Sequence, residues 1–287
     1  MSEQPISRFH SVADTARWIA AYRAQETDRP DAIFRDPYAR TFAGNAGVAM
    51  AGFSRPGRSA AWAMIVRTAV FDELIMREVT VGGCDCVLNL GAGLDTRPQR
   101  LALPPNLLWI EVDLPAMVAY KNESLAGVPS ACRIERVAID LSEEGPRTAL
   151  FARVNAQCKR VLVVSEGLTV YLSEENVARL GRDLYACPNF ALWLIDQASP
   201  AILDFMRRGY HKGLEAANAP MLFGPKNGLA FHAAQGWVPR EVRDMIGEAR
   251  RLKREMRGAA FLRALGILRA RDPKYWSAMA LLERKTG

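Results

Sequence analysis

The pattern of hydrophobic and polar positions changes near residue 80. Before it, apolar residues recur at helical spacing in ADTARWIAAYRAQE and in the run from Ala60 to Val79. A connector with two prolines, TDRPDAIFRDP, lies between these two segments. Beyond residue 80, short apolar runs alternate with polar segments of helical length. The pattern therefore predicts a helical N-terminal cap over 1–80 and an α/β domain over 81–287.

The short apolar runs beyond residue 80 are rich in valine, isoleucine and leucine, which is typical of strands buried on both faces of a sheet. They are CVLNLG (86–91), LLWIEVD (107–113), CRIERVAID (132–140), RVLVVSEG (160–167) and FALWLID (190–196). The segments between them can each form a helix, so the alternation predicts a doubly wound parallel sheet with right-handed crossovers. WSAMALLERK (276–285) can supply a further strand, and residues 198–235 form an insert outside this alternation.

Composition narrows the class of protein. A hydrophobic content of 49% and a charged content of 24% are ordinary for a soluble globular chain. The sequence has no run of about 18 uncharged apolar residues, and MSEQPISRFHSVADTARW lacks the apolar segment of a secretory signal. We therefore expect a cytoplasmic protein with no membrane partner. Nothing in the sequence indicates an oligomeric state.

The cysteines, the histidines and the charge distribution argue against a metal site and against a nucleic-acid-binding protein. The five cysteines are scattered without a CxxC pair, and the three histidines form no HExxH motif, so we expect reduced, packed thiols and no metal site. The net charge is +7, and much of the basic excess lies in 240–271. The basic residues there have helical spacing, which favours a solvated cationic face over a nucleic-acid site.

Two glycines, Gly91 and Gly93, end the first predicted strand in the segment GAGLDTRPQR. Ligands of open α/β sheets bind at the carboxyl ends of the strands, where a missing Cβ lets a ligand approach the backbone. The dinucleotide fingerprint GxGxxG is incomplete, because Thr96 takes the place of its third glycine. Asp113 closes the second predicted strand about 20 residues further on, where a carboxylate can accept hydrogen bonds from both hydroxyls of a ribose. These residues indicate an adenosine ligand, which NAD and S-adenosylmethionine share.

Acidic residues also end the third and fourth predicted strands. Asp140 can accept a hydrogen bond from the adenine amino group, while Leu141 offers backbone and apolar contacts to the ring. Glu166 can accept from a ligand ammonium group or offset a sulfonium charge. Taken singly, Asp140 can be a helix N-cap and Glu166 a surface residue. Taken together with Thr96, which indicates that no phosphate is held, they favour S-adenosylmethionine as the cofactor.

Several motifs in order resemble the leucine carboxyl methyltransferase family. They are VLNLGAGLDTRPQRL, EVDLP with Lys121, VAID followed by Leu141, and SEGLTVYLSEENV. The segments RAQETDRPDAIFRDPYAR and VRTAVFDELI look like N-terminal signatures of its bacterial branch of S-adenosylmethionine-dependent methyltransferases. The resemblance covers roughly 15–195 and the Gly-Trp pair at 236–237. It implies a class I methyltransferase fold, with a Rossmann-like sheet.

The resemblance also implies roles for individual residues. Arg67 matches an arginine that pairs with the carboxylate of the cofactor's methionine part, a task that suits the two parallel donors of a guanidinium. Arg23 falls near a second basic position of the family; for both arginines the alternative is a solvated helix charge. The implied partners are the methionine part for Gly91, the ribose for Asp113, the adenine for Asp140 and Leu141, and the reactive end of the cofactor for Glu166. Tyr171 matches an aromatic residue that either lines the acceptor pocket or packs in the core.

The insert at 198–235 is the candidate lid over the acceptor, with a packed helical excursion as the alternative. Its aromatic, methionine and histidine residues are Phe205, Met206, Tyr210, His211, Met221, Phe223, Phe231 and His232. His211 or His232 is a candidate general base. Known eukaryotic members methylate a protein's C-terminal leucine, but the N-terminal signatures here resemble the bacterial branch, where small-molecule and natural-product acceptors are more typical.

The sequence thus predicts an S-adenosylmethionine-dependent O-methyltransferase that acts on a carboxyl or hydroxyl group of a small, aromatic or polyketide-like metabolite. The alternatives are a non-catalytic module that binds an adenosyl ligand and an NAD-dependent oxidoreductase. Nucleic-acid methylation ranks below these.

Overall fold

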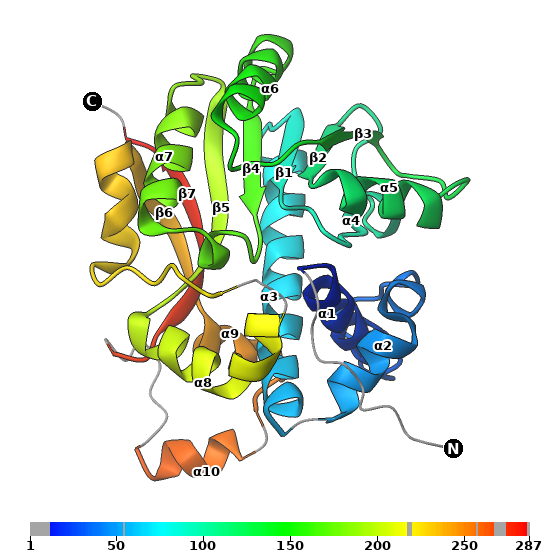
Figure 1. The fold of residues 1–287 in the computed structure, drawn as a ribbon, viewed down its shortest axis with the longest axis vertical. Coiled ribbons are helices and arrows are strands. Elements are labelled where there is room, and N and C mark those ends of the chain that lie inside the picture. The colour runs from blue at the N-terminus through cyan, green and yellow to red at the C-terminus, as the bar shows by residue number, and fades with distance from the viewer. Residues whose placement is uncertain (1–11, 54, 217–219, 257, 267–273, 286–287) are drawn as a thin grey trace.

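The structure is a computed structural model that describes residues 12–53, 55–216, 220–256, 258–266 and 274–285. The described residues form one seven-stranded sheet in the order β3-β2-β1-β4-β5-β7-β6 (Figure 1). The strands are β1 (Cys86–Leu90), β2 (Leu108–Asp113), β3 (Arg133–Ala138), β4 (Val161–Ser165), β5 (Phe190–Ala198), β6 (Trp237–Asp244) and β7 (Ser277–Arg284). The strands β1 to β5 are parallel and the strand order reverses between β1 and β4, which confirms the predicted α/β fold.

The last two strands make the sheet mixed rather than wholly parallel. Strand β7 pairs antiparallel with β5, and β6 pairs antiparallel with β7. The sequence predicts β7 but not β6, and the helical spacing expected from residue 240 is wrong for 240–244. Strand β6 lies at the sheet edge, carries Pro239 and has a bulge between Pro239 and Glu241. A proline at an edge strand and a mostly half-buried or exposed surface remove the apolar signal that reveals the other strands.

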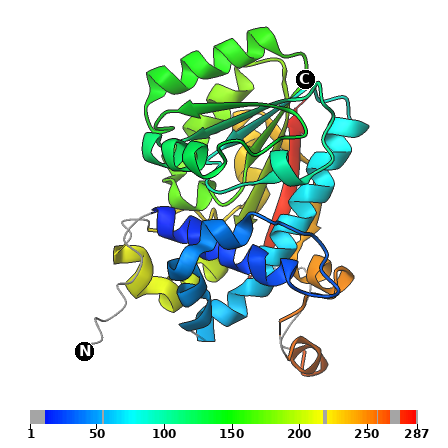
Figure 2. The same ribbon diagram turned by 90° about the vertical axis from the view of Figure 1, so that its right-hand side faces the viewer.

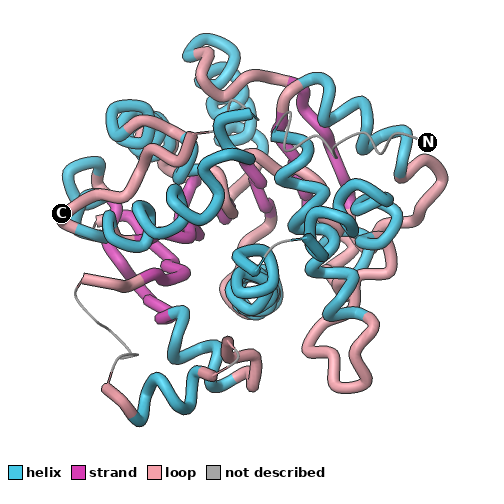
Figure 3. Tube along the Cα trace, turned by 60° about the horizontal axis from the view of Figure 1, so that its bottom comes forward, coloured by secondary structure: helices cyan, strands magenta, loops and turns pink. Residues whose placement is uncertain are grey.

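Helices cover both faces of the sheet, as the strands crossing between two helical layers show (Figure 3). Helices α3 (Arg55–Thr80) and α9 (Met245–Arg251) share one apolar core with one set of strand side chains. Helices α6 (Glu144–Gln157) and α7 (Glu174–Tyr185) share the opposite core with the alternate set. Side chains alternate between the two cores along each strand, with Val87 in the first core and Leu88 in the second. This double burial accounts for the uniformly apolar strand sequences.

Helices α1 (Val12–Thr27) and α2 (Ala39–Phe53) pack with α5 (Pro115–Ser124) in a third apolar cluster. They lie below the carboxyl ends of the parallel strands, across from α8 (Pro200–Ala216) (Figures 1 and 2). The remaining short elements are α4 (Arg97–Arg100), η1 (Thr169–Tyr171), η2 (Gly228–Gln235) and α10 (Ala259–Ala264). Because α3 shares a core with the sheet, the N-terminal helices and the sheet pack as one body. The domain boundary near residue 80 stays a prediction.

Several described arginines of the basic segment that begins at residue 240 pair with carboxylates. Arg251 pairs with Glu73 at 2.7 Å, and the buried Arg254 pairs with Glu26 at 2.8 Å. Arg243 donates to Glu241 as well. For the buried Arg254 the expectation of a solvated cationic face is wrong, whereas Arg251 is exposed and keeps contact with solvent.

The five cysteines are buried and carry free thiols, as the sequence predicts. No helix in the described ranges is both long and apolar enough to cross a membrane. Among the same residues, no group of three or more histidine, cysteine or acidic side chains is placed to hold a metal ion. The cytoplasmic location stays a prediction.

Candidate active site

A cavity of about 660 Å³ lies at the carboxyl edge of the parallel strands, within the range of roughly 300–1,000 Å³ usual for small-molecule sites. The loops after β1 to β4 and the end of β5 form its floor, and α1 and α3 contribute to its walls. Residues of α8 and of the segment that follows it, together with residues of α9 and the start of β7, also line it. The cavity contains the described sequence-predicted site residues Arg23, Arg67, Gly91, Gly93, Asp113, Asp140, Leu141, Glu166 and Tyr171.

The glycine turn after β1 is tied directly to the end of β2. Gly91 and Gly93 both have left-handed backbone, with φ of 64° and 46°. The backbone N–H of Gly93 donates to Asp113 Oδ2 at 2.7 Å, and that of Gly91 donates to the carbonyl of Val112 at 2.9 Å. A Cβ on Gly91 would lie 3.0 Å from a side-chain carbon of Leu168. Glycine therefore serves both the turn and the close approach, and the turn positions the Asp113 carboxylate.

Asp113 keeps the capacity to bind a diol. Its Oδ1 accepts from the backbone N–H of Leu114 at 2.8 Å, so each oxygen holds one backbone donor. Burial raises the pKa of Asp113, and these two N–H donors oppose the rise. An ionised carboxylate has about four lone-pair sites. Each oxygen can therefore accept one further hydrogen bond, as two neighbouring ribose hydroxyls require.

The loop after β3 lines another part of the cavity with Ile139, Asp140, Leu141 and Ser142. Asp140 Oδ1 accepts from the backbone N–H of Ser142 at 2.8 Å, a local turn that fixes the carboxylate. The N-cap of the following helix is Glu143, so Asp140 does not cap it. A fixed acid beside two apolar side chains suits an adenine ring and its amino group.

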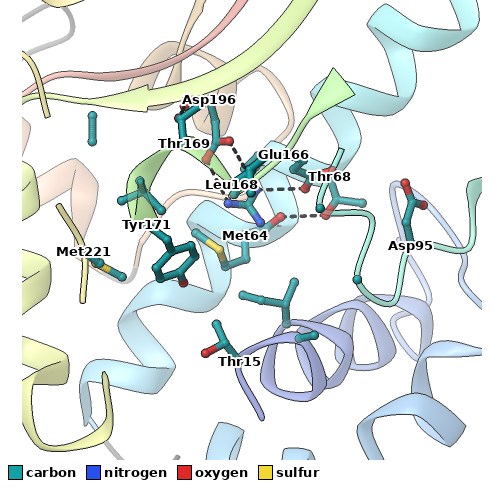
Figure 4. Close-up of a pocket in the computed structure, with 18 of the residues that line it drawn as sticks. Thr15, Met64, Thr68, Asp95, Glu166, Leu168, Thr169, Tyr171, Asp196 and Met221 are labelled. Atoms are coloured by element: carbon teal, nitrogen blue, oxygen red, sulfur yellow. Dashed lines mark hydrogen bonds and ion pairs between the residues drawn. The ribbon is translucent and has the colours of Figure 1, made fainter. Parts of the chain in front are cut away.

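Arg67 is held between the carboxylates of Glu166 and Asp196, which are labelled in Figure 4. Its Nε donates to Glu166 Oε1 at 2.9 Å, and its Nη1 donates to Asp196 Oδ2 at 3.0 Å. No described residue accepts a hydrogen bond from its Nη2. Burial would lower the pKa of Arg67, but Asp196 and Glu166 outweigh burial and raise it. Arg67 is thus a fixed cation with one terminal nitrogen left for a ligand, rather than a solvated helix charge.

Glu166 lines the cavity, but arginines engage both of its oxygens. Oε2 forms an ion pair with Nη2 of the buried Arg97 at 2.8 Å, while Oε1 accepts a hydrogen bond from Arg67. Burial would raise the pKa of Glu166, yet Arg97 and Arg67 lower it. Glu166 is therefore ionised and first of all orients two arginines. Its contact with a ligand ammonium group stays a prediction.

Arg97 links this group to further acids. Its Nε donates to Asp72 at 2.7 Å, and its Nη1 pairs with Asp95 at 2.8 Å. Arg100 donates to both oxygens of the same Asp72. Sequence reasoning gave Arg97 no role. Its three ion pairs make the floor of the cavity a connected, buried charge network.

Arg23 is nearly buried and also lines the cavity. Its Nε donates to Asp36 at 2.8 Å, and its Nη2 donates to the carbonyl of Leu94 at 2.6 Å. The second bond fastens α1 to the loop that begins with the two glycines. Arg23 is therefore not a solvated charge. A direct contact with the cofactor stays a prediction.

Tyr171 both lines the cavity and packs with Leu203 and Met221. Its hydroxyl points toward Thr15 of α1 in Figure 4. Burial raises the pKa of Tyr171, so the phenol is neutral at physiological pH. A neutral phenol can donate a hydrogen bond to an acceptor molecule, but it is a poor proton acceptor.

The structure tests one of the two histidines that the sequence offers as a general base. His211 lies in α8, but its side chain is outside the described residues and its role stays a prediction. His232 is fully buried and does not line the cavity. Burial lowers the pKa of His232 to about 4. His232 is therefore not a base in contact with an acceptor.

The described part of the insert supplies an apolar wall. From it Ile202, Phe205, Met206, Met221 and Phe223 line the cavity. Ile19, Met64 and Met245, which come from α1, α3 and α9, also line the cavity with apolar side chains. Phe231 packs against Phe223 in a neighbouring cluster and does not line the cavity. This apolar region, called the acceptor arm below, adjoins the charged group of Arg67, Glu166 and Asp196.

Asp196 is the site residue that sequence reasoning missed most directly. It ends the apolar run FALWLID (190–196) as Asp113 ends LLWIEVD (107–113), although β5 itself continues to Ala198, and this parallel in the sequence was the available signal. Its Oδ1 accepts from the backbone N–H of Gly167 at 2.6 Å, while Oδ2 accepts from Arg67. Asp196 therefore ties the loop after β4 to the arginine.

The chain matches known proteins along most of its length. Residues 16–184 match the family described as leucine carboxyl methyltransferase. A protein of Streptomyces coelicolor, named as a candidate S-adenosyl-L-methionine-dependent methyltransferase, is 32% identical over 82% of this chain and 86% of its own length. A protein of Frankia alni with the same description is 33% identical over 68% of this chain and 72% of its own length.

Solved structures share the fold at lower identity. A candidate methyltransferase of Thermobifida fusca has a TM-score of 0.60 at 13% identity, covering 97% of this chain and 96% of its own. A DUF574 family protein of Streptomyces avermitilis has a TM-score of 0.58 at 18% identity, covering 93% of this chain and 97% of its own.

Geometry and relatives agree on the chemistry. The chain is an S-adenosylmethionine-dependent methyltransferase with a class I, Rossmann-like fold. The NAD-dependent oxidoreductase and the non-catalytic binding module are set aside. The motifs after β1, β2, β3 and β4 lie within the matched region and meet at one cavity, and the chain belongs to the leucine carboxyl methyltransferase family.

Proposed function

We propose that the protein methylates an oxygen of a small, aromatic or polyketide-like molecule, either a carboxyl or a hydroxyl group. The observation that carries this proposal is the acceptor arm, an apolar region that opens directly onto the charged group of Arg67, Glu166 and Asp196. An apolar body fits the arm, and a polar reacting group fits the charged end.

The cavity suits the cofactor in charge and shape. Among the described lining residues there are four arginines and five carboxylates, an excess of one negative charge. S-adenosylmethionine carries a sulfonium, an ammonium and a carboxylate group, and so a single net positive charge. Arg67 offers Nη2 to the carboxylate, Asp113 offers two acceptors to the ribose, and the loop after β3 surrounds the adenine. These placements support the proposed contacts of the cofactor.

The protein's main task is positioning. S-adenosylmethionine supplies an electrophilic methyl group whose sulfonium becomes a neutral thioether when the methyl leaves. Methyl transfer needs the nucleophile in line with that bond in a site that excludes water. The Asp72–Arg97–Glu166–Arg67–Asp196 network holds one side of the site rigid, and the apolar wall of α8 and its following segment excludes water from the other.

The described side chains favour a carboxylate acceptor over a phenol. A carboxylate, with a pKa near ~4, is already ionised at neutral pH, whereas a phenol, near ~10, benefits from a base. Tyr171 is neutral, Glu166 is occupied by two arginines, and His232 lies outside the cavity. A methyl ester is therefore the expected product.

The test is a methyl-transfer screen with S-adenosylmethionine labelled in the methyl group, against a panel of aromatic acids and phenols. We expect labelled products whose label is released by mild base, because esters hydrolyse and ethers do not. Base-stable products would indicate hydroxyl acceptors. Transfer to nitrogen or carbon acceptors only would contradict the proposal.

A further inference from the structure

Some apolar side chains of the cavity lining are exposed to water. Among the described residues, three large apolar side chains are both exposed and part of the lining: Leu114, Phe205 and Tyr275. Leu114 directly follows Asp113 and so belongs to the cofactor end. Phe205 is 69% exposed and comes from α8, and Tyr275 is 49% exposed and comes from the segment just before β7. These two aromatic side chains therefore lie where the acceptor arm meets solvent, and we call them the rim pair.

Helix α8 presents one face to the cavity. Its lining residues Ile202, Phe205 and Met206 are three and four positions apart, which places them on the same side of the helix. Arg207, the next residue, donates from Nε to the carbonyl of Met221 at 2.7 Å and so fastens this turn of α8 to the segment that follows the helix. Phe205 is thus exposed on a turn that is held in place.

Ser199 joins the start of α8 to the segment before β7. Its backbone N–H donates to the carbonyl of Trp276 at 2.9 Å, and its hydroxyl donates to the carbonyl of Lys274 at 2.8 Å. Tyr275 lies between these two acceptors in the sequence, so it is held next to the start of α8. The two segments that carry the rim pair are therefore fixed to each other.

The arm extends well beyond the charged group. Trp62, Met64 and Arg67 of α3 all line the cavity. Because a helix rises about 1.5 Å per residue, this lining runs about 7.5 Å along the axis of α3 from Arg67 to Trp62. Met245 and Ile246 of α9 line the same region, and the described lining residues of α8 and α9 include no charged side chain. The arm therefore fits an elongated, uncharged body.

We propose that Phe205 and Tyr275 determine acceptor specificity by packing on the part of the acceptor that is furthest from the methylated oxygen. The inference rests on the proposed function and narrows its substrate class. The acceptor is elongated: its reacting oxygen lies near Arg67 and Asp196, and its far end is an uncharged aromatic group that reaches the rim pair. Binding then buries aromatic surface that is otherwise exposed to water, which the hydrophobic effect favours.

The test uses three carboxylate probes of increasing length, which are benzoate, 2-naphthoate and biphenyl-4-carboxylate, with S-adenosylhomocysteine in the cofactor site. Calorimetry measures the affinity for each probe. In the wild type we expect affinity to rise along the series, because only the longer probes reach the rim pair. Phe205→Ala removes apolar contact area at the rim, so affinity for biphenyl-4-carboxylate should fall about tenfold, whereas affinity for benzoate should stay within about twofold.

Phe261→Ala is the matched control. Phe261 lies in α10 and is 67% exposed, close to the value for Phe205, but it does not line the cavity. This variant should leave the affinities for all three probes unchanged. Tyr275→Ala should repeat the length-dependent loss, and Phe205→Leu should lose less than Phe205→Ala because it keeps apolar surface. Affinity for S-adenosylhomocysteine, measured first, should be the same in all variants.

Equal affinity of the wild type for the three probes, or no binding of any of them, would overturn the inference. A loss in Phe205→Ala that is as large for benzoate as for biphenyl-4-carboxylate, or that Phe261→Ala reproduces, would also overturn it. Sedimentation of the wild type and of Phe205→Ala provides a further check. A dimer that the substitution abolishes, with unchanged probe affinities, would show that Phe205 contacts a second copy of the chain instead.

Ester formation from the probes is measured separately, with labelled S-adenosylmethionine. Ester formation without any effect of the rim pair on probe affinity would leave the proposed reaction standing and remove the rim contact. Length-dependent binding that needs Phe205, without ester formation, would contradict the proposed reaction and leave the rim contact standing.

Discussion

At the scale of single residues, the carboxylates of the cavity fall into two groups. Glu166 and Asp196 are bound to arginines, so they fix positive charge in place. Asp113 is bound to the backbone N–H groups of Gly93 and Leu114, and Asp140 to that of Ser142, so both keep acceptor capacity for neutral donors. This division assigns the first group to orienting Arg67 and Arg97, and the second to a ribose and an adenine.

The sequence predicts the second group more completely than the first. Asp113 and Asp140 are recognisable because each ends an apolar run and binds the loop next to it. Asp196 is bound to Arg67 and Gln197 to His232, and both partners are distant along the chain. Such pairs depend on how helices α3 and η2 dock on the sheet, which local patterns do not specify.

Replacing Asp113 tests the ribose contact. Asp113→Ala removes both acceptors and the partner of the Gly93 N–H, so affinity for S-adenosylmethionine should fall at least about tenfold, as expected for lost hydrogen bonds to a charged group. Calorimetry measures this affinity. Asp28→Asn is the control, because Asp28 is in an exposed ion pair and should change nothing. Wild-type affinity in Asp113→Ala would remove this residue from the cofactor site.

Replacing Arg67 separates charge from geometry. Arg67→Lys keeps the positive charge but cannot span Glu166 and Asp196 while donating to a ligand carboxylate. We expect Arg67→Lys to weaken S-adenosylmethionine binding about tenfold and Arg67→Ala to weaken it further. Equal losses in the two variants, measured by calorimetry, would show that the guanidinium geometry, with Nε and Nη1 on carboxylates and Nη2 left for the cofactor, is not needed.

At the scale of elements, the strands differ in how clearly the sequence reveals them. The apolar runs of the parallel strands are visible in the sequence because both of their faces are buried. Strand β6 is not visible, because an edge strand needs neither alternation nor apolar residues on both faces. The antiparallel pairing of β7 with β6 could not be predicted either, because β6 is not recognisable in the sequence.

The turn after β1 gives an element-scale prediction. Gly91→Ala forces a left-handed backbone on alanine and places a Cβ 3.0 Å from Leu168, so both folding stability and S-adenosylmethionine affinity should fall. Gly127→Ala is the matched control, with φ of 74° and open space around the new Cβ. It should lower the urea midpoint without changing cofactor affinity. Cofactor affinity that is unchanged in Gly91→Ala would contradict the close approach proposed for this turn.

At the scale of the whole molecule, burial shifts the pKa values of ionisable groups, and these shifts link folding to pH. His232 is the clearest case. Burial lowers its pKa from 6.5 to about 4 in the folded chain. Between these values the unfolded chain binds more protons, so the His232 contribution is fully present above about pH 6.5 and is lost toward about pH 4.

The expected size of this effect is roughly 3 kcal/mol of unfolding free energy. Urea denaturation at about pH 7.5 and about pH 4 measures it in the wild type and in His232→Phe. The variant loses the bond to Gln197 at both pH values, but its stability should depend less on pH. The same pH dependence in both proteins would show that His232 is not held neutral by burial.

The most direct test of the whole account is a crystal structure of the protein with bound S-adenosylmethionine. We predict the ribose hydroxyls within hydrogen-bond distance of Asp113, the methionine carboxylate on Arg67, and the adenine between the residues of the loop after β3. The methyl group should face the acceptor arm. Cofactor density outside this cavity, or Asp113 and Arg67 without contact to it, would contradict the account.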